Sequence, residues 1–371
     1  MALRPAEELL TEALSAWNWG GLVVGAVRYG CGHINDTFCV YVQDDNGDCL
    51  RYILQRINTQ TFTDPAGLME NICGVTAFLR KHIEANGGDP MRETMNVVPT
   101  KEGKPFYADT AEGAWRAYNF VEDTVCLQKS ETPEDFYASA YAFGRFQQQL
   151  ADYPAATLHE TIARFHDTEN RYANFEKALA ADACGRAAEV SAEIEFVRAR
   201  KEDCSHMMGL LREGKLPLRV THNDTKLNNI LMDKKTREGI CVIDLDTVMP
   251  GLVANDYGDS IRFGANDCAE DEPDLSKVNF SLPLFETYTK GFLAAAGSAL
   301  TQTEKDTLIW GAKLMTLECG IRFLTDYLEG DHYFKTHRPG QNLDRCRTQF
   351  KLVSDMEGVW DQMAAIVAKY A

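Results

Sequence analysis

Strand-like and helix-like patterns occupy different parts of this chain of 371 residues. Short apolar runs separated by turn signals fill residues 21–123, around one helical segment at 64–86. From residue 131 onward the pattern is mostly helical, and one β-rich island at 228–251 interrupts it. Strands followed by helices, without regular alternation, predict an α+β fold and argue against a Rossmann fold or a TIM barrel.

Residues 1–122 are expected to form one lobe, an antiparallel sheet of five strands preceded by an amphipathic helix. Its main helix should begin after Asp64, which caps Pro65 at the first helical position. Residues 123–371 are expected to form a second, mainly helical lobe, with long helices between Thr161 and Glu213. The strands of the first lobe are predicted at 21–30, 36–43, 50–58, in a hairpin around Glu102 and Gly103, and at 113–123.

The composition limits the partners of the chain. A formal net charge of -17 argues against nucleic acid or an anionic membrane as the main partner. The 11 cysteines are scattered and form no CxxC pair, as expected of free thiols in a reducing cytosol. No apolar stretch approaches the roughly 18 residues of a membrane span, and the N-terminus lacks a signal-peptide core. The prediction is a cytoplasmic protein, a monomer or weak dimer.

The stretch THNDTKLNNILMD, residues 221–233, has the residue spacing of a phosphoryl-transfer loop. The pattern H-x-D-x-x-x-x-N supplies a carboxylate for the attacking hydroxyl and an oxygen ligand for a metal ion. Asp224 is therefore the predicted base, Asn229 the predicted metal ligand, and Lys226 can reach the transferred phosphate. Because D-x-K-x-x-N arises by chance in about one chain in 20 of this length, this motif alone is weak evidence and a second motif is needed.

A predicted hairpin provides the second motif. Asp244 follows the apolar run GICVI, 20 residues after Asp224, on the returning arm of a hairpin that begins beside Asn229. Mg²⁺ prefers one or two carboxylates together with phosphate oxygens, so Asp244 is the predicted principal ligand. Asp246 is an alternate or second ligand. The competing interpretation is a strand end that simply runs into solvent.

A third motif lies near the N-terminus. Gly30, Gly32 and Asn35 form a G-x-G-x-x-N sequence between two predicted strands, the position of a nucleotide lid in kinases. No G-x-x-x-x-G-K-[ST] sequence is present, which excludes a P-loop NTPase.

Together, HNDTKLNN, VIDLDTVMPG and NDYGDSIR resemble the aminoglycoside phosphotransferase and choline kinase-like superfamily, most closely its N-acetylhexosamine 1-kinases. The resemblance extends from about Gly25 to about Asp344. It implies a bilobal protein-kinase-like fold, an ATP and Mg²⁺ requirement, and the same roles for Asp224, Asn229 and Asp244. It also implies that Asp259 is a structural carboxylate that supports the loop after the metal-binding Asp.

The chain departs from the kinase pattern on its third strand. A kinase places a Lys there against the α- and β-phosphates, whereas this chain has Gln55 and Arg56. Strand alternation puts the two on opposite faces, so only one can serve. Arg56 has the charge and is assigned to the nucleotide site, with Glu70 as its expected partner. Asn223 replaces the Arg with which regulated protein kinases read a phosphorylated loop, which favours a constitutively active small-molecule kinase.

The adenine is expected at the end of the sheet. There the backbone of Val121 to Asp123 would hydrogen-bond the base, and Phe120 would pack near it. For each residue, an ordinary strand end is an equally good interpretation.

The acceptor is expected between the Asp224 loop and the C-terminal helices. Glu318, Arg322 and Asp326 recur every four residues and so share one helix face. One interpretation is a solvated, salt-bridged stripe. The other is a sugar-binding wall, with Arg322 donating to sugar oxygens and Tyr333 stacking on the ring or hydrogen-bonding to it. His33 in the lid loop is a further candidate for contact with sugar or phosphate.

The leading functional prediction is transfer of the ATP γ-phosphate to the anomeric hydroxyl of GlcNAc or GalNAc. A second prediction keeps this chemistry with an amino alcohol or aminoglycoside acceptor, which would suit the net charge but not Arg322. A third is a nucleotide-binding pseudokinase, which the missing strand Lys permits and the intact set of Asp224, Asn229 and Asp244 argues against.

Overall fold

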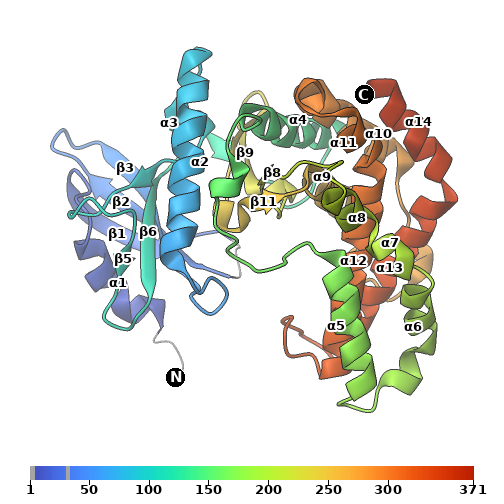
Figure 1. The fold of residues 1–371 in the computed structure, drawn as a ribbon. Helices are drawn as coiled ribbons and strands as arrows, with labels where there is room; N and C mark the ends of the chain where they lie inside the picture. The colour runs from blue at the N-terminus through green and yellow to red at the C-terminus, as the bar shows by residue number, and fades with distance from the viewer. Residues whose placement is uncertain (1–4, 31–33) are drawn as a thin grey trace.

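The structure is a computed structural model that describes residues 5–30 and 34–371. It has a sheet lobe formed by the N-terminal part of the chain and a helical lobe formed by the remainder (Figure 1). The helix α2 (Pro65–Ala85) lies between the sheet and the helical lobe (Figure 1). The predicted α+β fold with two lobes is confirmed.

The sheet of the first lobe is antiparallel and has the order β1-β2-β3-β6-β4, with β5 also paired to β6. It therefore has six strands and not the predicted five. The difference comes from the 97–108 segment, whose two arms are only two residues long and pair with β6 and not with each other. The strands are β1 (Leu22–Arg28), β2 (Asp36–Gln43), β3 (Cys49–Ile57), β4 (Val97–Val98), β5 (Tyr107–Ala108) and β6 (Ala114–Asn119).

Each face of this sheet packs on a helix. Leu54 and Trp115 pack with α1 (Ala6–Ser15), and Ile57 and Tyr118 pack with α2. The start of α2 follows from its sequence, because the Asp64 carboxylate accepts a hydrogen bond from Gly67 N at 3.0 Å, with Pro65 first in the helix. Since β3 alternates, Gln55 lies on the α2 side of the sheet and Arg56 on the α1 side.

The core of the second lobe is a helix bundle centred on α12, which packs against α5, α9 and α13. The long helices predicted between Thr161 and Glu213 are four separate ones, and the first of them, α5, ends at Asp182, which adopts the left-handed conformation with φ 37°. No helix in the described residues is long and apolar enough to cross a membrane. The helices are α3 (Pro90–Glu93, beside α2), α4 (Pro133–Gln149), α5 (Thr168–Ala181), α6 (Ser191–Arg198), α7 (Lys201–Cys204), α8 (His206–Arg212), α9 (Val253–Gly264), α10 (Leu282–Ala296), α11 (Gln302–Asp306), α12 (Leu308–Glu329), α13 (Gln341–Gly358) and α14 (Trp360–Tyr370).

The β-rich island forms two small sheets that position the polar loops. The predicted hairpin is confirmed: β9 (Ile230–Asp233) pairs antiparallel with β10 (Gly239–Val242), and β7 (Thr124–Val125) adds a third strand. The strands β8 (Arg219–Thr221) and β11 (Met249–Gly251) pair beside it. The 222–229 loop runs from β8 to β9 and the 243–248 loop runs from β10 to β11, so both loops emerge between the same two small sheets.

Candidate active site

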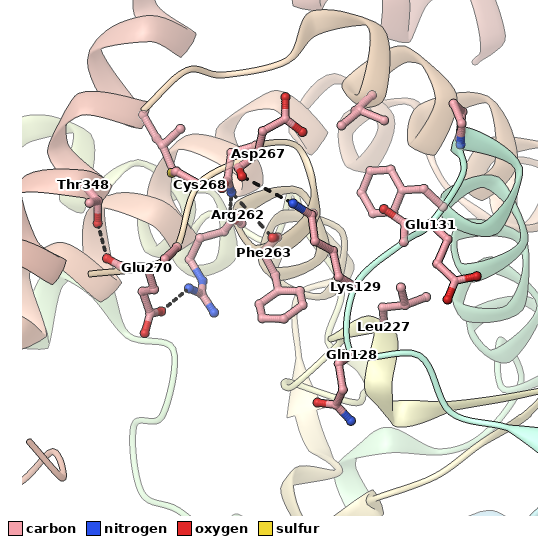
Figure 2. Close-up of a pocket in the computed structure, with 18 of the residues that line it drawn as sticks. Gln128, Lys129, Glu131, Leu227, Arg262, Phe263, Asp267, Cys268, Glu270 and Thr348 are labelled. Carbon is pink, nitrogen blue, oxygen red and sulfur yellow. Dashed lines mark hydrogen bonds and ion pairs between the residues drawn. The ribbon is translucent and has the colours of Figure 1, made fainter. Parts of the chain in front are cut away.

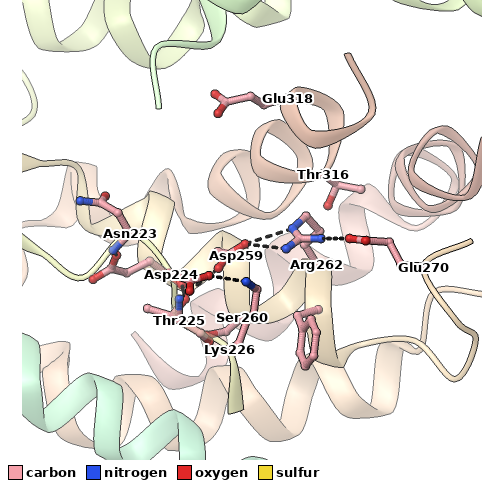
Figure 3. A network of polar contacts seen from close by, with 12 residues as sticks. Asn223, Asp224, Thr225, Lys226, Asp259, Ser260, Arg262, Glu270, Thr316 and Glu318 are labelled. Atoms are coloured by element: carbon pink, nitrogen blue, oxygen red, sulfur yellow. Dashed lines mark hydrogen bonds and ion pairs between the residues drawn. The ribbon is translucent and has the colours of Figure 1, made fainter. Parts of the chain in front are cut away.

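Two carboxylates of α9 hold the backbone of the 222–229 loop. Asp256 accepts hydrogen bonds from His222 N at 2.8 Å and Asn223 N at 2.7 Å. Asp259 accepts one from Thr225 N at 3.0 Å and also binds Arg262 (Figure 3). Both carboxylates are buried, so the amides they bind have little competition from water.

This arrangement corrects the role predicted for Asp259. Asp259 supports the loop that carries Asp224, and not the loop after Asp244. Sequence reasoning missed Asp256, although both residues lie in the NDYGD motif three positions apart, where they share one face of a helix.

Asp224 lies between these anchors and is paired with a cation. Lys226 Nζ lies 2.7 Å from Asp224 Oδ1, and Asn229 Nδ2 donates to Asp224 Oδ2 at 3.1 Å and to its backbone oxygen at 2.8 Å. Burial alone would raise the pKa of Asp224, but Lys226, His222 and the Asn229 amide together hold it below the usual value. The carboxylate is therefore ionised at neutral pH and able to accept a proton.

His222 and Asn223 tie the two loops together. The buried His222 ring donates from Nε2 to Ile243 O at 2.8 Å, and its Nδ1 accepts from Asp224 N at 3.3 Å. Asn223 adopts φ 64° and its Nδ2 donates to Thr247 O at 2.8 Å. The His of the motif thus fixes the distance between the Asp224 loop and the 243–248 loop.

Asp244 has the environment of an oxygen ligand for a metal ion. It follows β10 in a left-handed conformation with φ 61°, and Ile243 N donates to Asn229 O at 2.9 Å, which brings the two loops together. Among the described residues, none donates a hydrogen bond to its carboxylate or forms an ion pair with it. The surrounding protein and the charges of Asp246 and Asp224 raise the pKa of Asp244 to about 6.

These observations fit a Mg²⁺ ion. An unpartnered carboxylate among other carboxylates favours a cation, and the amide Oδ1 of Asn229 is a second oxygen donor on the adjoining loop. Within the part of the chain that the structure describes, no group of three or more His, Cys, Asp and Glu side chains is placed to hold a metal ion. Such an ion would thus need Asn229 and oxygen atoms of the nucleotide phosphates beside Asp244.

Asp246 is engaged by the sheet lobe. Its Oδ1 lies 2.5 Å from Arg116 Nη1, and its Oδ2 accepts from Asn35 Nδ2 at 2.6 Å. Arg116 on β6 also donates to Gln55 Oε1 from Nε and Nη2, at 3.1 and 3.0 Å. The carboxylate of Asp246 therefore joins the lobes, and Arg116 is a buried cation of the site that sequence reasoning missed. The available signal was its position on β6, directly opposite Gln55 in the register.

The pairing predicted for Arg56 is wrong. Arg56 is buried on the α1 side of the sheet, where its Nε lies 3.2 Å from Asp109 Oδ2. The Glu70 carboxylate instead lies 2.6 Å from His159 Nε2 at the surface. The physical reason is the strand alternation, which turns Gln55 and not Arg56 toward Arg116 and Asp246.

The predicted lid is only partly described, whereas the predicted adenine-binding segment from Val121 to Asp123, here called the hinge, is described in full. Gly30 has φ 78°, a conformation that glycine adopts readily. Gly32 and His33 lie outside the described residues. In the hinge, Val121 O accepts from Thr124 Oγ1 at 2.9 Å and Asp123 O accepts from Lys234 N at 3.0 Å. These carbonyls are thus already hydrogen-bonded within the chain.

Arg51 covers the aromatic ring of the hinge. Its guanidinium carbon lies 3.9 Å from the centre of the Phe120 ring, and it forms an ion pair with Glu122. This cation–π contact orients Phe120 beside the predicted adenine-binding backbone.

The face of α12 that carries Glu318, Arg322 and Asp326 is not a solvated, salt-bridged stripe. Glu318 is buried and its Oε1 lies 3.0 Å from His166 Nδ1, while His166 Nε2 donates to Asn223 O at 3.1 Å. Glu318 and His166 therefore connect α12 to the residue before Asp224. His166 was not identified from the sequence, where it is a single His in a loop.

Asp326 has a structural role and not the binding role considered for it. It is buried and accepts hydrogen bonds from the backbone amides of His332, Tyr333 and Phe334. This fixes the loop that presents Tyr333, which is 70% exposed and accepts a hydrogen bond from Arg322 Nη2 at 3.3 Å.

A cavity of about 400 Å³ adjoins the 222–229 loop at Leu227 (Figure 2). Its wall combines Phe263 with the acidic residues Glu131, Asp267 and Glu270 and with the basic residues Lys129 and Arg262, and Arg262 is paired with Glu270. Lys129 Nζ donates to Asp267 O at 3.3 Å across this space. The cavity therefore offers charged groups of both signs and an aromatic ring, and Arg322 is not among its lining residues.

Comparison with known proteins agrees with this geometry. A family model described as "Phosphotransferase enzyme family" matches residues 28–280, which is more than half of the chain. The chain therefore belongs to the phosphotransferase enzyme family and is a phosphotransferase.

Solved structures share its fold. A microcompartment-associated aminopropanol kinase has 16% sequence identity and a TM-score of 0.60, with 96% of this chain and 98% of that chain covered. The amicoumacin kinase hAmiN, in complex with AMP-PNP, Ca²⁺ and Ami, has 15% identity and a TM-score of 0.59 over 94% and 93% of the two chains. A choline kinase from Cryptosporidium parvum has 12% identity and a TM-score of 0.56 over 99% of each chain. At these identities the similarity establishes the fold.

Proposed function

We propose that this phosphotransferase is a small-molecule kinase that transfers the γ-phosphoryl group of ATP to the anomeric hydroxyl of GlcNAc or GalNAc. The observation that carries the proposal is the convergence of Asp224, Lys226, Asn229 and Asp244 on two adjoining loops. It supplies a base, a cation and oxygen ligands for a metal ion within one site.

In the proposed reaction, Asp224 accepts the proton of the anomeric hydroxyl as the sugar oxygen forms its bond to the γ-phosphorus. The bond from that phosphorus to the bridging oxygen breaks, and ADP leaves with its electron pair. Lys226, which pairs with Asp224 before substrate binds, then donates to the γ-phosphoryl oxygens. Asp244 and Asn229 would hold Mg²⁺, which when bound supplies positive charge to the phosphate oxygens.

Arg322 and Tyr333 support a sugar as the acceptor. Arg322 donates to Tyr333, and its guanidinium carbon lies 5.8 Å from the ring centre of Phe165. Aromatic rings and a guanidinium suit a ligand with apolar ring faces and oxygen acceptors, and the guanidinium repels an ammonium group. An N-acetylhexosamine meets these requirements.

A second candidate is an amino alcohol or aminoglycoside kinase. The names of solved structures with this fold refer to aminopropanol and choline kinases. In the cavity beside Leu227, Asp267 forms no ion pair with a described residue and would attract an ammonium group. A nucleotide-binding pseudokinase has less support, since it needs no base and Asp224 is ionised and anchored.

The test is ADP release with ATP and Mg²⁺ from GlcNAc, GalNAc, galactose, glucosamine, choline and kanamycin, compared side by side. The proposal expects GlcNAc or GalNAc to have the highest kcat/KM, with the sugar 1-phosphate as product. A preference for choline or kanamycin would replace it with the second candidate, and Mg²⁺-dependent ATP binding without turnover would support the pseudokinase.

A further inference from the structure

Unlike most arginines in the described residues, Arg322 forms no ion pair with a carboxylate. Every arginine in the described residues lies within 4.0 Å of a carboxylate, with the exceptions of Arg80 and Arg322. Arg80 is on α2, away from the site, whereas Arg322 is on α12 beside Glu318. Among the described residues, its one hydrogen bond is the contact of 3.3 Å with the Tyr333 hydroxyl, and its guanidinium otherwise faces aromatic rings. The guanidinium of Arg322 therefore has N–H donors that are not used within the described chain.

A second guanidinium with unused donors lies nearby. Arg171 on α5 donates from Nη2 to Phe165 O at 2.6 Å, and Arg322 faces the ring of the same Phe165. The Nε of Arg171 is buried and has no hydrogen-bond partner in the part of the chain that the structure describes. Burial and the charge of Arg322 lower the pKa of Arg171. Two guanidiniums therefore lie within electrostatic reach of each other without full compensation.

Glu318 supplies only part of that compensation. Its Oε1 is 4.0 Å from Arg171 Nε, too far for a hydrogen bond, because its two oxygens already bind His166 and Thr168. His166 in turn binds Asn223 O, so this cluster adjoins Asp224 through the backbone (Figure 3 shows Glu318, Asn223 and Asp224 in one view). The two arginines thus lie on the Glu318 side of the 222–229 loop, and Glu318 and His166 connect them to the residue before Asp224.

We propose that Arg171 and Arg322 together bind a carbonyl oxygen of the acceptor, and that Arg171 is a residue that determines acceptor specificity. A planar guanidinium presents several donors in a fixed arrangement, which suits an amide carbonyl, and two of them repel an ammonium group. The proposal rests on the function proposed above and deepens it: the acyl group of an N-acetylhexosamine is the part of the substrate that the pair selects.

The test uses the full-length enzyme with GlcNAc, glucose and glucosamine as acceptors. In Arg171→Met, kcat/KM for GlcNAc should fall about 10- to 100-fold, as expected for loss of a hydrogen bond from a charged donor. The value for glucose, which lacks the acyl group, should change little, and the KM for ATP should stay the same. Arg171→Lys keeps the charge and should recover part of the preference. Arg198→Met is the matched control, because Arg198 is an exposed arginine and its partner Glu176 lies on α5, the helix of Arg171.

The outcomes separate this inference from the proposed function. If the wild-type enzyme prefers choline or kanamycin, the proposed function fails before any variant is measured, and the inference fails with it. If the wild-type enzyme prefers GlcNAc and Arg171→Met keeps the wild-type ratio of GlcNAc to glucose, only the inference is overturned. If kcat/KM falls equally for both sugars in Arg171→Met and again in Arg171→Lys, Arg171 only supports Phe165. That result would also overturn the inference.

Discussion

At the scale of single residues, the site consists of charged groups whose states are set by close neighbours. Asp224 stays ionised because Lys226 and Asn229 stabilise its charged form despite burial. His166 is buried too, yet the hydrogen bond and charge of Glu318 raise its pKa on balance. Burial disfavours the charged form of both side chains, and specific partners nevertheless stabilise that form.

Replacing Asp224 should abolish most of the activity. In Asp224→Asn the amide cannot accept the proton of the hydroxyl, so kcat should fall about 10²- to 10⁴-fold. The KM for ATP should change little. Steady-state kinetics with GlcNAc measures both, and Asp361→Asn on the exposed side of α14 is the control. Turnover of Asp224→Asn close to wild type would contradict the proposed mechanism.

The contribution of His166 to stability should depend on pH. Its pKa is higher in the folded protein than the ordinary value of about 6.5, so folding takes up a proton. The stabilisation is thus complete below about pH 6.5 and is lost as the pH rises through the folded pKa. The difference in Tm between wild type and His166→Gln should therefore narrow as the pH rises.

Thermal unfolding between pH 6 and pH 9 measures this difference. His337→Gln, in an exposed loop, is the control and should show no such trend. A Tm difference for His166→Gln that widens with pH would mean that His166 is neutral in the folded protein.

At the scale of elements, α9 acts as the support of the 222–229 loop. Two of its carboxylates accept hydrogen bonds from three backbone amides of the loop, those of His222, Asn223 and Thr225. A fourth contact comes from Ser260, whose hydroxyl donates to Thr225 O at 2.7 Å. One helix thus holds the loop by its backbone, which leaves the side chains of Asp224 and Lys226 for substrate.

Removing one of these carboxylates should loosen the loop. In Asp256→Asn one backbone amide loses its acceptor and the other keeps only a neutral one, so the free energy of unfolding should fall by about 1.5–3 kcal/mol. The displaced loop should also lower kcat by about tenfold or more. Urea unfolding and steady-state kinetics test the two effects, with the exposed Asp306→Asn as control. An unchanged kcat would show that Asp256 does not position Asp224.

At the scale of the whole molecule, the contacts between the lobes include a buried ion pair. Asp246 of the helical lobe binds Arg116 and Asn35 of the sheet lobe. The ion pair is almost fully buried, with side-chain exposures of 1% and 4%. Breaking a buried pair by removing one partner leaves an uncompensated charge, which costs more than replacing both.

The predicted consequence is a non-additive pair of substitutions. Arg116→Met should lower the free energy of unfolding by about 3–5 kcal/mol, because Asp246 is left buried without its cation. The double variant Arg116→Met with Asp246→Asn should be more stable than Arg116→Met alone. Urea unfolding of the two single variants and the double variant gives the interaction energy. Additive effects would show that the pair does not join the lobes energetically.

The sequence by itself determined the order of the elements and the residues of the two loops. Strand and helix periodicities are local, so the sheet, α2 and the hairpin at β9 and β10 were predicted with bounds close to those observed. The spacing of His222, Asp224 and Asn229 is local as well. The hairpin then brings Asp244 back beside Asn229, since antiparallel pairing leaves little freedom in where a returning strand ends.

Tertiary structure decided the partners of each charge. Arg56 binds Asp109 and not Glu70, and Arg116 binds Asp246. Both choices depend on which elements pack together, although these elements are far apart in the chain. The same holds for Arg171, which meets Arg322 only because α5 packs on α12. Local sequence sets backbone conformation through short-range sterics and hydrogen bonds, whereas ion pairs and burial are set by the packing of distant segments.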